Sequence, residues 1–344
     1  MPGALKKQSE TISAEKPVQK NTAVVVLNYN NWQDTLLCVE SILSGVELPR
    51  WLLVIDNASS DGSAQHFAQW AASRPNRHFT LDFSGVNVPF DAESLLENCE
   101  GVRVASAVPH IIFVHAATNR GYAAGNNLGI AMALHLGADA VWILNNDTIV
   151  DKNALAAMRE RLFSKPRPGL CGSLVCYMEG ARLVQCRAGG YTNKWTGLSA
   201  FDGNGLEPAV ALEEDPVAVE KRINFICGAS VMASREFIET VGLMDERYFL
   251  YCEEQDWAYS AKGRFDFAYA PGALVLHKEG ATTGFSHTKL RVKSLWYLTR
   301  SRILLAWKHV PYALPSVCFT IFAAAARMLW RRLEIRKRGR SRRL

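Results

Sequence analysis

Apolar runs alternate with helix-periodic segments through the first half of the chain. The run 23–28, AVVVLN, is rich in β-branched residues, which is typical of a buried parallel strand. The segment 31–44 that follows has apolar residues at helical spacing, and the same alternation predicts strands over 51–57, 110–115 and 140–146 and helices over 59–70 and 121–137. This order predicts an α/β fold: a mostly parallel, Rossmann-like sheet with helices on both faces.

The remaining segments depart from this rhythm. Residues 1–21 have no apolar core, so they predict a disordered lead-in and not a secretory signal. Residues 74–109 are polar and show no clean period, which predicts an insertion between two strand–helix units. In the second half, strands are predicted over 169–177 and 267–277, and helices over 234–242 and from 251 onward.

The end of the chain, 306–344, predicts a helical tail that associates with a membrane. Residues 310–326 carry no charge, but they fall short of the ~20 residues that span a bilayer, and Pro311 and Pro315 interrupt them. From Arg327 onward there are nine Arg/Lys and one Glu, a net +8. A buried helix and a helix at the membrane interface both fit 310–326, and the basic residues behind it favour the interface with an anionic membrane surface.

Composition and charge exclude several classes of protein. The chain has 344 residues, 49% of them hydrophobic and 21% charged, which is typical of a globular protein with a substantial core. No two of the eight cysteines form a C-x-x-C pair, so the chain has neither a zinc ribbon nor a dithiol redox motif. Subtracting the tail's +8 from the whole-chain charge of +6 leaves −2, and a net negative body argues against a nucleic-acid partner.

Polar side chains follow each of the first four predicted strands. Turn chemistry alone can place Asn and Asp at such positions. However, the carboxyl ends of parallel strands lie along one edge of a sheet, and ligands of open α/β sheets bind outside that edge. Four polar ends in one half of a sheet therefore favour a site for a polar, phosphate-bearing ligand. The residues are Asn28, Asn30, Asp56, Asn57, Asn119, Arg120, Asn145, Asn146 and Asp147.

The usual glycine-rich phosphate loops are absent. The first strand leads into NYNNW and not into G-x-G-x-x-G, and G-x-x-x-x-G-K-[ST] does not occur. A divalent metal is the remaining common way to neutralise a diphosphate. Asp147 is the candidate oxygen ligand for Mg²⁺ or Mn²⁺.

Six stretches, taken together and in order, resemble the family 2 glycosyltransferases. They are VVVLNYNNW, VIDNASSDGS, NRGYAAGNNLGI, WILNNDTIV, ICGASVMASREFIETVGLMDERYFLYCEEQDWAYSAKG and LVLHKEGATTG. Within the family the chain resembles the bacterial rhamnosyltransferase-like branch, over residues 22–305. The resemblance implies a GT-A domain over those residues and inverting transfer of a sugar from a nucleotide-sugar, with a divalent metal.

The resemblance also implies roles for individual residues. Asp56 would recognise the base, and Asn145–Asp147 would occupy the family's D-x-D position, where Asn145 replaces the first Asp but could still bond a ribose hydroxyl. Asp147 would bind the metal, and His277 would complete the metal or diphosphate site. The implied nucleotide-binding set is Asn28, Asn30, Asp56, Asn119, Arg120, Gly121, Asn127, Asn145 and Asn146.

The stretch CEEQDW carries the candidate catalytic residues. Glu253 and Glu254 match the family's acidic pair, whose second member is the usual base, although it is Glu here and not Asp. Asp256 is the rival candidate. An inverting transfer needs an ionised carboxylate within hydrogen-bond reach of the acceptor hydroxyl, and a helix N-terminus helps to keep it ionised.

These observations predict a membrane-associated glycosyltransferase. The donor would be a dTDP- or UDP-sugar, with rhamnose from dTDP-rhamnose favoured, and the acceptor a glycan or a polyprenyl-diphosphate-linked sugar in cell-surface polysaccharide synthesis, such as that of O-antigen. The protein would be cytoplasmic and peripheral on the inner face of the plasma membrane. A UDP-hexose transferase of the same fold stays open, as does a catalytically silent protein that binds membrane or nucleic acid. The presence of both Asp147 and the acidic cluster argues against the silent alternative.

Overall fold

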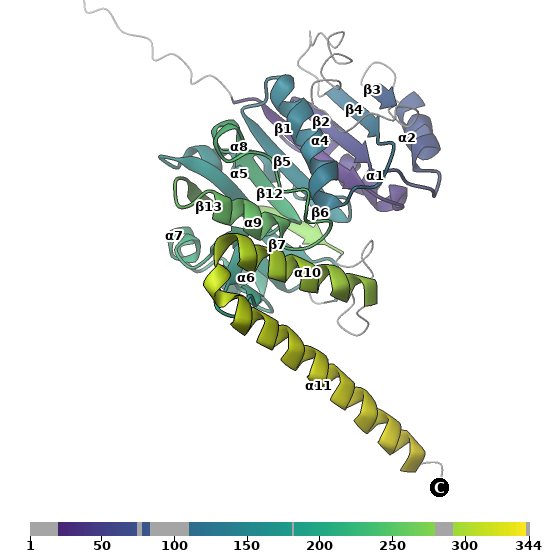
Figure 1. Ribbon diagram of the computed structural model, residues 1–344. Helices are drawn as coiled ribbons and strands as arrows, with labels where there is room; N and C mark the ends of the chain where they lie inside the picture. Colours follow the sequence, from purple (N-terminus) through teal and green to yellow (C-terminus); the bar gives the residue numbers. More distant parts are fainter. Residues whose placement is uncertain (1–19, 74–77, 83–109, 181, 279–291, 342–344) are drawn as a thin grey trace, which may run out of the picture.

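Figure 1 shows the computed structural model, which describes residues 20–73, 78–82, 110–180, 182–278 and 292–341. Residues 1–19 of the predicted lead-in and most of the predicted insertion lie outside these residues. The elements of the first half are β1 (Thr22–Asn28), α1 (Trp32–Leu43), β2 (Trp51–Asp56), α2 (Ser63–Ala72), β3 (His78–Asp82), β4 (His110–His115), α4 (Tyr122–His135), β5 (Ala140–Asn145), β6 (Thr148–Val150) and α5 (Ala154–Phe163). Those of the second half are β7 (Pro168–Tyr177), β8 (Val184–Arg187), β9 (Gly189–Thr192), β10 (Ser199–Phe201), α6 (Pro208–Ala211), α7 (Pro216–Glu220), β11 (Phe225–Ile226), β12 (Ser230–Ser234), α8 (Arg235–Val241), α9 (Glu253–Ser260), β13 (Asp266–His277), α10 (Val292–His309), the 3₁₀ turn η1 (Pro311–Ala313) and α11 (Leu314–Ser341).

One large sheet organises the molecule. Its strand order is β3-β4-β2-β1-β5-β12-β7-β13-β6, with β8 paired to β7. The half from β3 to β5 is entirely parallel, as the strand–helix alternation predicts. The other half is mixed, because β12 runs antiparallel to both β5 and β7. The pattern did not predict β12 or the edge strand β3, which falls inside the segment 74–109.

Helices cover both faces of the sheet, as predicted. Successive residues of a strand point to opposite faces, so Val25 and Val24 of β1 belong to different cores. The first core is shared with α4, α8 and α9, and the second with α1, α2 and α5. Helix α4 packs unusually close to the sheet, because a Cβ atom added at Gly129 would lie 2.5 Å from the Val25 side chain. Figure 1 shows these layers.

Parallel register aligns the polar strand ends along one rim. Asn28, the last residue of β1, lies opposite Asp56, the last residue of β2. Asp56 in turn lies opposite His115 at the end of β4, and Asn145 at the end of β5 lies opposite Leu27. The first four strand ends therefore meet at one edge, where the sequence placed the ligand site.

The C-terminal segment forms two helices, α10 and α11, joined by η1. Helix α10 lies along the body beside α9, and α11 points away from it (Figure 1). The two prolines of the apolar stretch explain the break: Pro311 opens η1, and Pro315 stands in the first turn of α11, where proline is tolerated. Among the described residues, no helix is long and apolar enough to cross a bilayer.

Candidate active site

A buried hydrogen-bond network joins the ends of β1 and β2. The Asn28 amide donates to the carboxylate of Asp56 at 2.8 Å and to the hydroxyl of Ser63 at 3.0 Å. Its oxygen accepts from Thr35 at 2.8 Å, and Thr35 also accepts from Asn146 at 2.9 Å. The network fixes the end of β1 in one orientation, because each of these polar groups is matched by a partner.

Asp56 lies at the centre of this rim. Burial acts to raise the pKa of its carboxyl, but hydrogen bonds from His115, Ser59 and Asn28 outweigh burial, so the pKa is lowered. Asp56 is therefore ionised at neutral pH and can accept a hydrogen bond from a nucleotide base. Sequence reasoning missed His115, whose ring nitrogen lies 3.5 Å from Asp56, although it closes a predicted strand.

Residues 119–127, which the sequence predicts to bind the nucleoside, contact the loop between α8 and α9. The amide of Asn127 donates to the carbonyl of Met244 at 2.8 Å and accepts from its N–H at 2.9 Å. Arg120 lies 2.7 Å from Glu246, and the N–H of Tyr122 donates to the carbonyl of Phe249. The contacts of Asn127 and Arg120 are thus structural. Their nucleoside-binding roles stay predictions.

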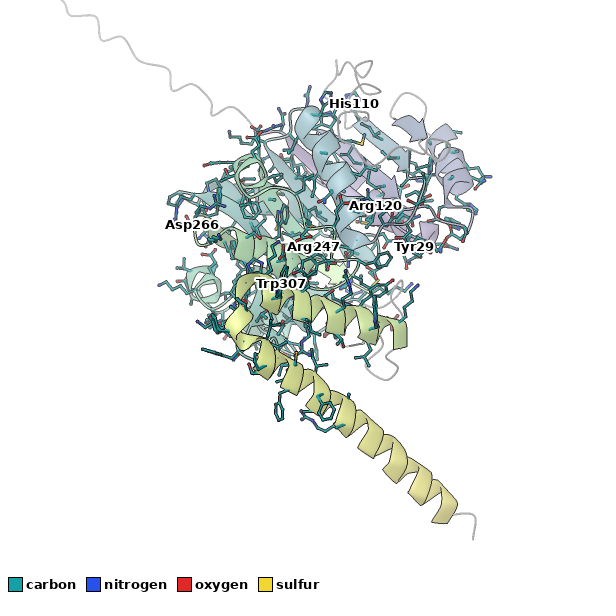
Figure 2. The ribbon with its side chains drawn as sticks, viewed as in Figure 1. Tyr29, His110, Arg120, Arg247, Asp266 and Trp307 are labelled. Carbon is teal, nitrogen blue, oxygen red and sulfur yellow. The ribbon has the colours of Figure 1, made fainter. Side chains whose placement is uncertain are left out.

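Three further residues of the set, Asn30, Asn119 and Gly121, also have hydrogen-bond partners within the chain. Asn119 accepts hydrogen bonds from Asn57 and from the N–H of Gly121. Gly121 has a φ of +97°, and a Cβ atom there would lie 2.4 Å from the Phe249 carbonyl, so only glycine fits this turn. Asn30 accepts a hydrogen bond from the N–H of Ser60. In Figure 2, Tyr29 and Arg120 lie on the same side of the molecule.

The candidate metal ligands Asp147 and His277 come together although they are far apart in sequence. Strand β13 pairs antiparallel with β6, which places His277 opposite Thr148. The Nε2 atom of His277 lies 3.1 Å from Oδ1 of Asp147, and both side chains are buried. Asn145 is the third side chain here, 3.4 Å from the same Nε2.

The partners of this pair fit a cation. Gln185 places its side-chain oxygen 2.8 Å from Nδ1 of His277. In a neutral ring with its hydrogen on Nδ1, the lone pair of Nε2 faces the carboxylate oxygen of Asp147, an arrangement in which both atoms could bind one cation. A carboxylate suits Mn²⁺ or Mg²⁺, whereas an imidazole suits transition metals, so the pair favours Mn²⁺ over Mg²⁺; the contact with Gln185 orients the imidazole. No group of three or more His, Cys, Asp or Glu residues gathers in the described part of the chain, so a bound cation would need diphosphate or water oxygens as well.

Glu253 and Glu254 open α9 after a strained turn. Tyr251 and Cys252 have φ values of 70° and 68°, and consecutive left-handed residues other than glycine are uncommon outside functional sites. Burial raises the pKa of both carboxyls, and the charge of Glu254 adds to the effect on Glu253. Glu253 is 3% exposed, whereas Glu254 is half-buried.

Loop 227–229, between β11 and β12, connects the acidic pair with the end of β5. An added Cβ atom at Gly228 would lie 3.1 Å from Oε1 of Glu254, so the absence of a side chain leaves room for the carboxylate. The hydroxyl of Tyr122 donates to the carbonyl of Gly228 at 2.8 Å. One residue on, the Ala229 carbonyl accepts from the N–H of Asn145 at 3.1 Å.

Asp256, the rival base, is engaged on the other side of α9. Residues two apart on a helix point about 200° apart, so Asp256 and Glu254 do not share a face. Its carboxylate contacts Lys308 at 2.8 Å and His309 at 2.8 Å, both from the end of α10, and accepts from the hydroxyl of Tyr248 at 3.1 Å. These three partners form a clamp on Asp256, which is 2% exposed.

Comparison with known proteins finds similarity to glycosyltransferases. No protein-family model matches the chain. The chain is 26% identical over 227 residues to N-acetylglucosaminyl-diphospho-decaprenol L-rhamnosyltransferase of Mycobacterium tuberculosis, covering 58% of this chain and 70% of that protein. It is 21% identical over 253 residues to the low-salt glycan biosynthesis hexosyltransferase Agl10 of Haloferax volcanii, covering 73% and 65%.

A solved structure supports the fold. The mannosyltransferase PcManGT of Pyrobaculum calidifontis, in complex with GDP-Man and Mn²⁺, aligns with a TM-score of 0.51 and 16% identity, covering 91% of this chain and 77% of that one. The protein thus has the GT-A fold and is similar in sequence to glycosyltransferases, in agreement with its resemblance to family 2 and to the rhamnosyltransferase-like branch.

Proposed function

We propose that the protein is an inverting glycosyltransferase that moves rhamnose from dTDP-rhamnose to a sugar carried on polyprenyl diphosphate. The acceptor class and the sugar are those in the name of the mycobacterial relative. The reaction would take place at the inner face of the plasma membrane, as a step of cell-surface polysaccharide synthesis.

The observation that carries the proposal is loop 227–229. Inversion needs a base on one side of the reacting sugar and stabilisation of the leaving diphosphate on the other. The loop's Gly228 lies against the carboxylate of Glu254, and its Ala229 bonds Asn145, next to the Asp147–His277 pair. A donor sugar over this loop would have a carboxylate on one side and the candidate cation ligands on the other.

Each residue then has a defined task. Glu254 accepts the proton of the acceptor hydroxyl as its oxygen attacks the anomeric carbon and the bond to the diphosphate breaks. Burial raises the pKa of Glu254 above its ordinary value, which makes its carboxylate a stronger base. A divalent cation held by Asp147 and His277 would neutralise the charge that develops on the leaving diphosphate. Asp56 and its hydrogen-bond partners bind the base of the nucleotide.

A UDP-hexose is the alternative donor, favoured by the name of the archaeal relative. Asp56 does not separate the two donors, because uracil and thymine present the same imide N–H to a carboxylate.

Thermal unfolding of the parent and of Asp147→Ala with dTDP, UDP and GDP, each with and without Mn²⁺, tests the proposal. A ligand that binds only the folded state raises the free energy of unfolding by about 2.7 kcal/mol at a hundredfold excess over its Kd, and Tm rises with it. We expect dTDP to raise Tm, Mn²⁺ to raise it further, and Asp147→Ala to lose the Mn²⁺ increment alone. Asp151→Ala, four residues along and exposed, is the matched control.

Two results would contradict the assignment. A shift with UDP but none with dTDP would favour the UDP-hexose alternative. An unchanged Tm with every nucleotide would contradict the proposal that the protein is a glycosyltransferase.

A further inference from the structure

Large apolar side chains gather where the hairpin between β9 and β10 meets the start of α11. Trp195 and Leu198 of the hairpin are 53% and 54% exposed, and Tyr312, Phe319 and Phe322 are 58%, 69% and 73% exposed. We call these five residues the apolar surface. All five residues are more than half exposed, although burial of any one of them would be favourable.

Contacts within the chain hold the two parts of the surface together. The ring of Trp195 packs edge-on against Tyr312 with centroids 5.0 Å apart. Thr320 donates to the carbonyl of Thr196 at 3.0 Å, and Arg302 of α10 donates to the carbonyls of Thr196 and Gly197. The hairpin therefore lies fixed beside α11, and its tryptophan is held at the surface.

The helix presents its phenylalanines on one face. At 100° per residue, Pro315, Phe319 and Phe322 fall within a narrow stripe, which faces away from buried Val317. Ser316 and Thr320, on the side next to the stripe, donate to the carbonyls of Trp195 and Thr196 in the hairpin. The exposed stripe is thus the face of α11 that the body of the protein leaves uncovered.

The charges around the apolar surface indicate what kind of partner binds it. Seven of the nine Arg/Lys from Arg327 onward follow the stripe on α11, and the Lys194 ammonium lies 6.0 Å from the ring of Trp195. Aromatic side chains bordered by cations match the boundary between the headgroups and the hydrocarbon of an anionic bilayer. A second copy of the chain fits less well, because it would bring two segments of net +8 together.

We propose that the apolar surface inserts into an anionic lipid bilayer, so that the hairpin between β9 and β10 is a second membrane contact besides the tail. This inference deepens the proposed function, since it assumes that the acceptor is reached at a membrane. Two contacts on different elements fix the orientation of the body on the bilayer, whereas the tail alone would leave it free to rotate.

Sedimentation of the full-length protein with vesicles of phosphatidylglycerol and phosphatidylcholine tests the proposal, at low salt and at 0.5 M NaCl. We expect the parent to stay partly bound at high salt, because salt screens the basic residues but not apolar insertion. The double variant Phe319→Ser, Phe322→Ser should bind at low salt and lose on the order of tenfold or more of its partition coefficient at high salt. Val46→Ser, which changes a side chain 74% exposed in the turn between α1 and β2, should leave binding unchanged.

Tryptophan fluorescence tests the hairpin itself. Vesicles with brominated lipid should quench part of the emission, and Trp195→Phe should remove that part. Equal high-salt binding of the parent and the double variant, or equal quenching with and without Trp195, would overturn the proposal. Parent protein that is dimeric without lipid, with a monomeric double variant, would assign the surface to a second copy instead.

These outcomes are separate from a failure of the proposed function. The nucleotide shifts in Tm report on the donor site alone. They would stay unchanged if only the lipid contact were wrong.

Discussion

At the scale of single residues, the two candidate bases differ in what surrounds them. Glu254 is half-buried beside a glycine, and Asp256 is held by three side chains. Glu254→Gln keeps the shape of the side chain but cannot accept a proton. We expect kcat to fall on the order of 10²–10⁴-fold with nucleotide affinity nearly unchanged, as measured by initial rates and calorimetry.

Asp256→Asn is the matched comparison, because it makes the same change two residues away. It should lower the Tm more than Glu254→Gln does, because it removes a buried carboxylate that pairs with Lys308 and His309. The roles of the two residues would have to be exchanged if Asp256→Asn lost kcat by this factor and Glu254→Gln did not.

The pKa of Glu254 predicts how activity depends on pH. Burial raises this pKa above its ordinary value of 4.5, so the carboxylate is lost as pH falls through a value higher than that of an exposed glutamate. We expect kcat/KM to decline on the acid side with an apparent pKa above 4.5. The value belongs to the Glu253–Glu254 pair, because the two carboxyls titrate together. A profile flat down to pH 4.5 would contradict this assignment.

At the scale of elements, α10 is tied to the helix that carries the acidic pair. Lys308 and His309, the last two residues of α10, both contact Asp256 of α9. Lys308→Met would leave the buried carboxylate with fewer partners, and loss of one partner of a buried pair costs on the order of 3 kcal/mol. We expect a lower Tm, and a kcat that falls more than nucleotide affinity does, because the first turn of α9 shifts.

Lys308→Arg keeps the charge and should restore most of kcat, and the exposed Lys152→Met should behave as the parent. A chain cut after Trp307 lacks both Lys308 and His309, so Asp256 loses two of its partners. We expect such a chain to lose activity toward every acceptor. Unchanged kcat in Lys308→Met would show that the clamp does not position α9.

At the scale of the whole molecule, charge and apolar surface are segregated. Residues 1–326 carry −2, and seven of the nine Arg/Lys from Arg327 onward lie on α11, which points away from the body (Figure 1). A chain that ends at Ala313 keeps the clamp and loses α11. We expect it to keep its nucleotide shifts in Tm and its activity toward a water-soluble acceptor analogue. Its activity toward a polyprenyl-linked acceptor in anionic vesicles should fall at least tenfold, because roughly 1 kcal/mol of attraction is lost per basic residue. An equal fall with both acceptors would contradict a membrane role for α11.

The sequence by itself determined the parallel half of the sheet and its rim. Strands such as 23–28 are β-branched and apolar up to a polar last residue, and parallel register brings such ends together whatever lies between them. Asn28, Asp56 and Asn145 could therefore be placed on one edge from their positions alone. The acidic turn at Glu253 and the basic tail were visible for the same reason, because each is a local run of residues.

The tertiary structure decided the contacts that join distant parts of the chain. Gln185 orients His277 across 92 residues, and Lys308 reaches Asp256 across 52. These pairings depend on how β8 lies relative to β13 and on where α10 packs, and no local pattern encodes either. The orientation of α9 likewise places Glu254 and Asp256 in different surroundings, although they are acidic residues only two positions apart. A strand or helix follows from short-range periodicity, but which side chains meet is set only when the whole core has packed.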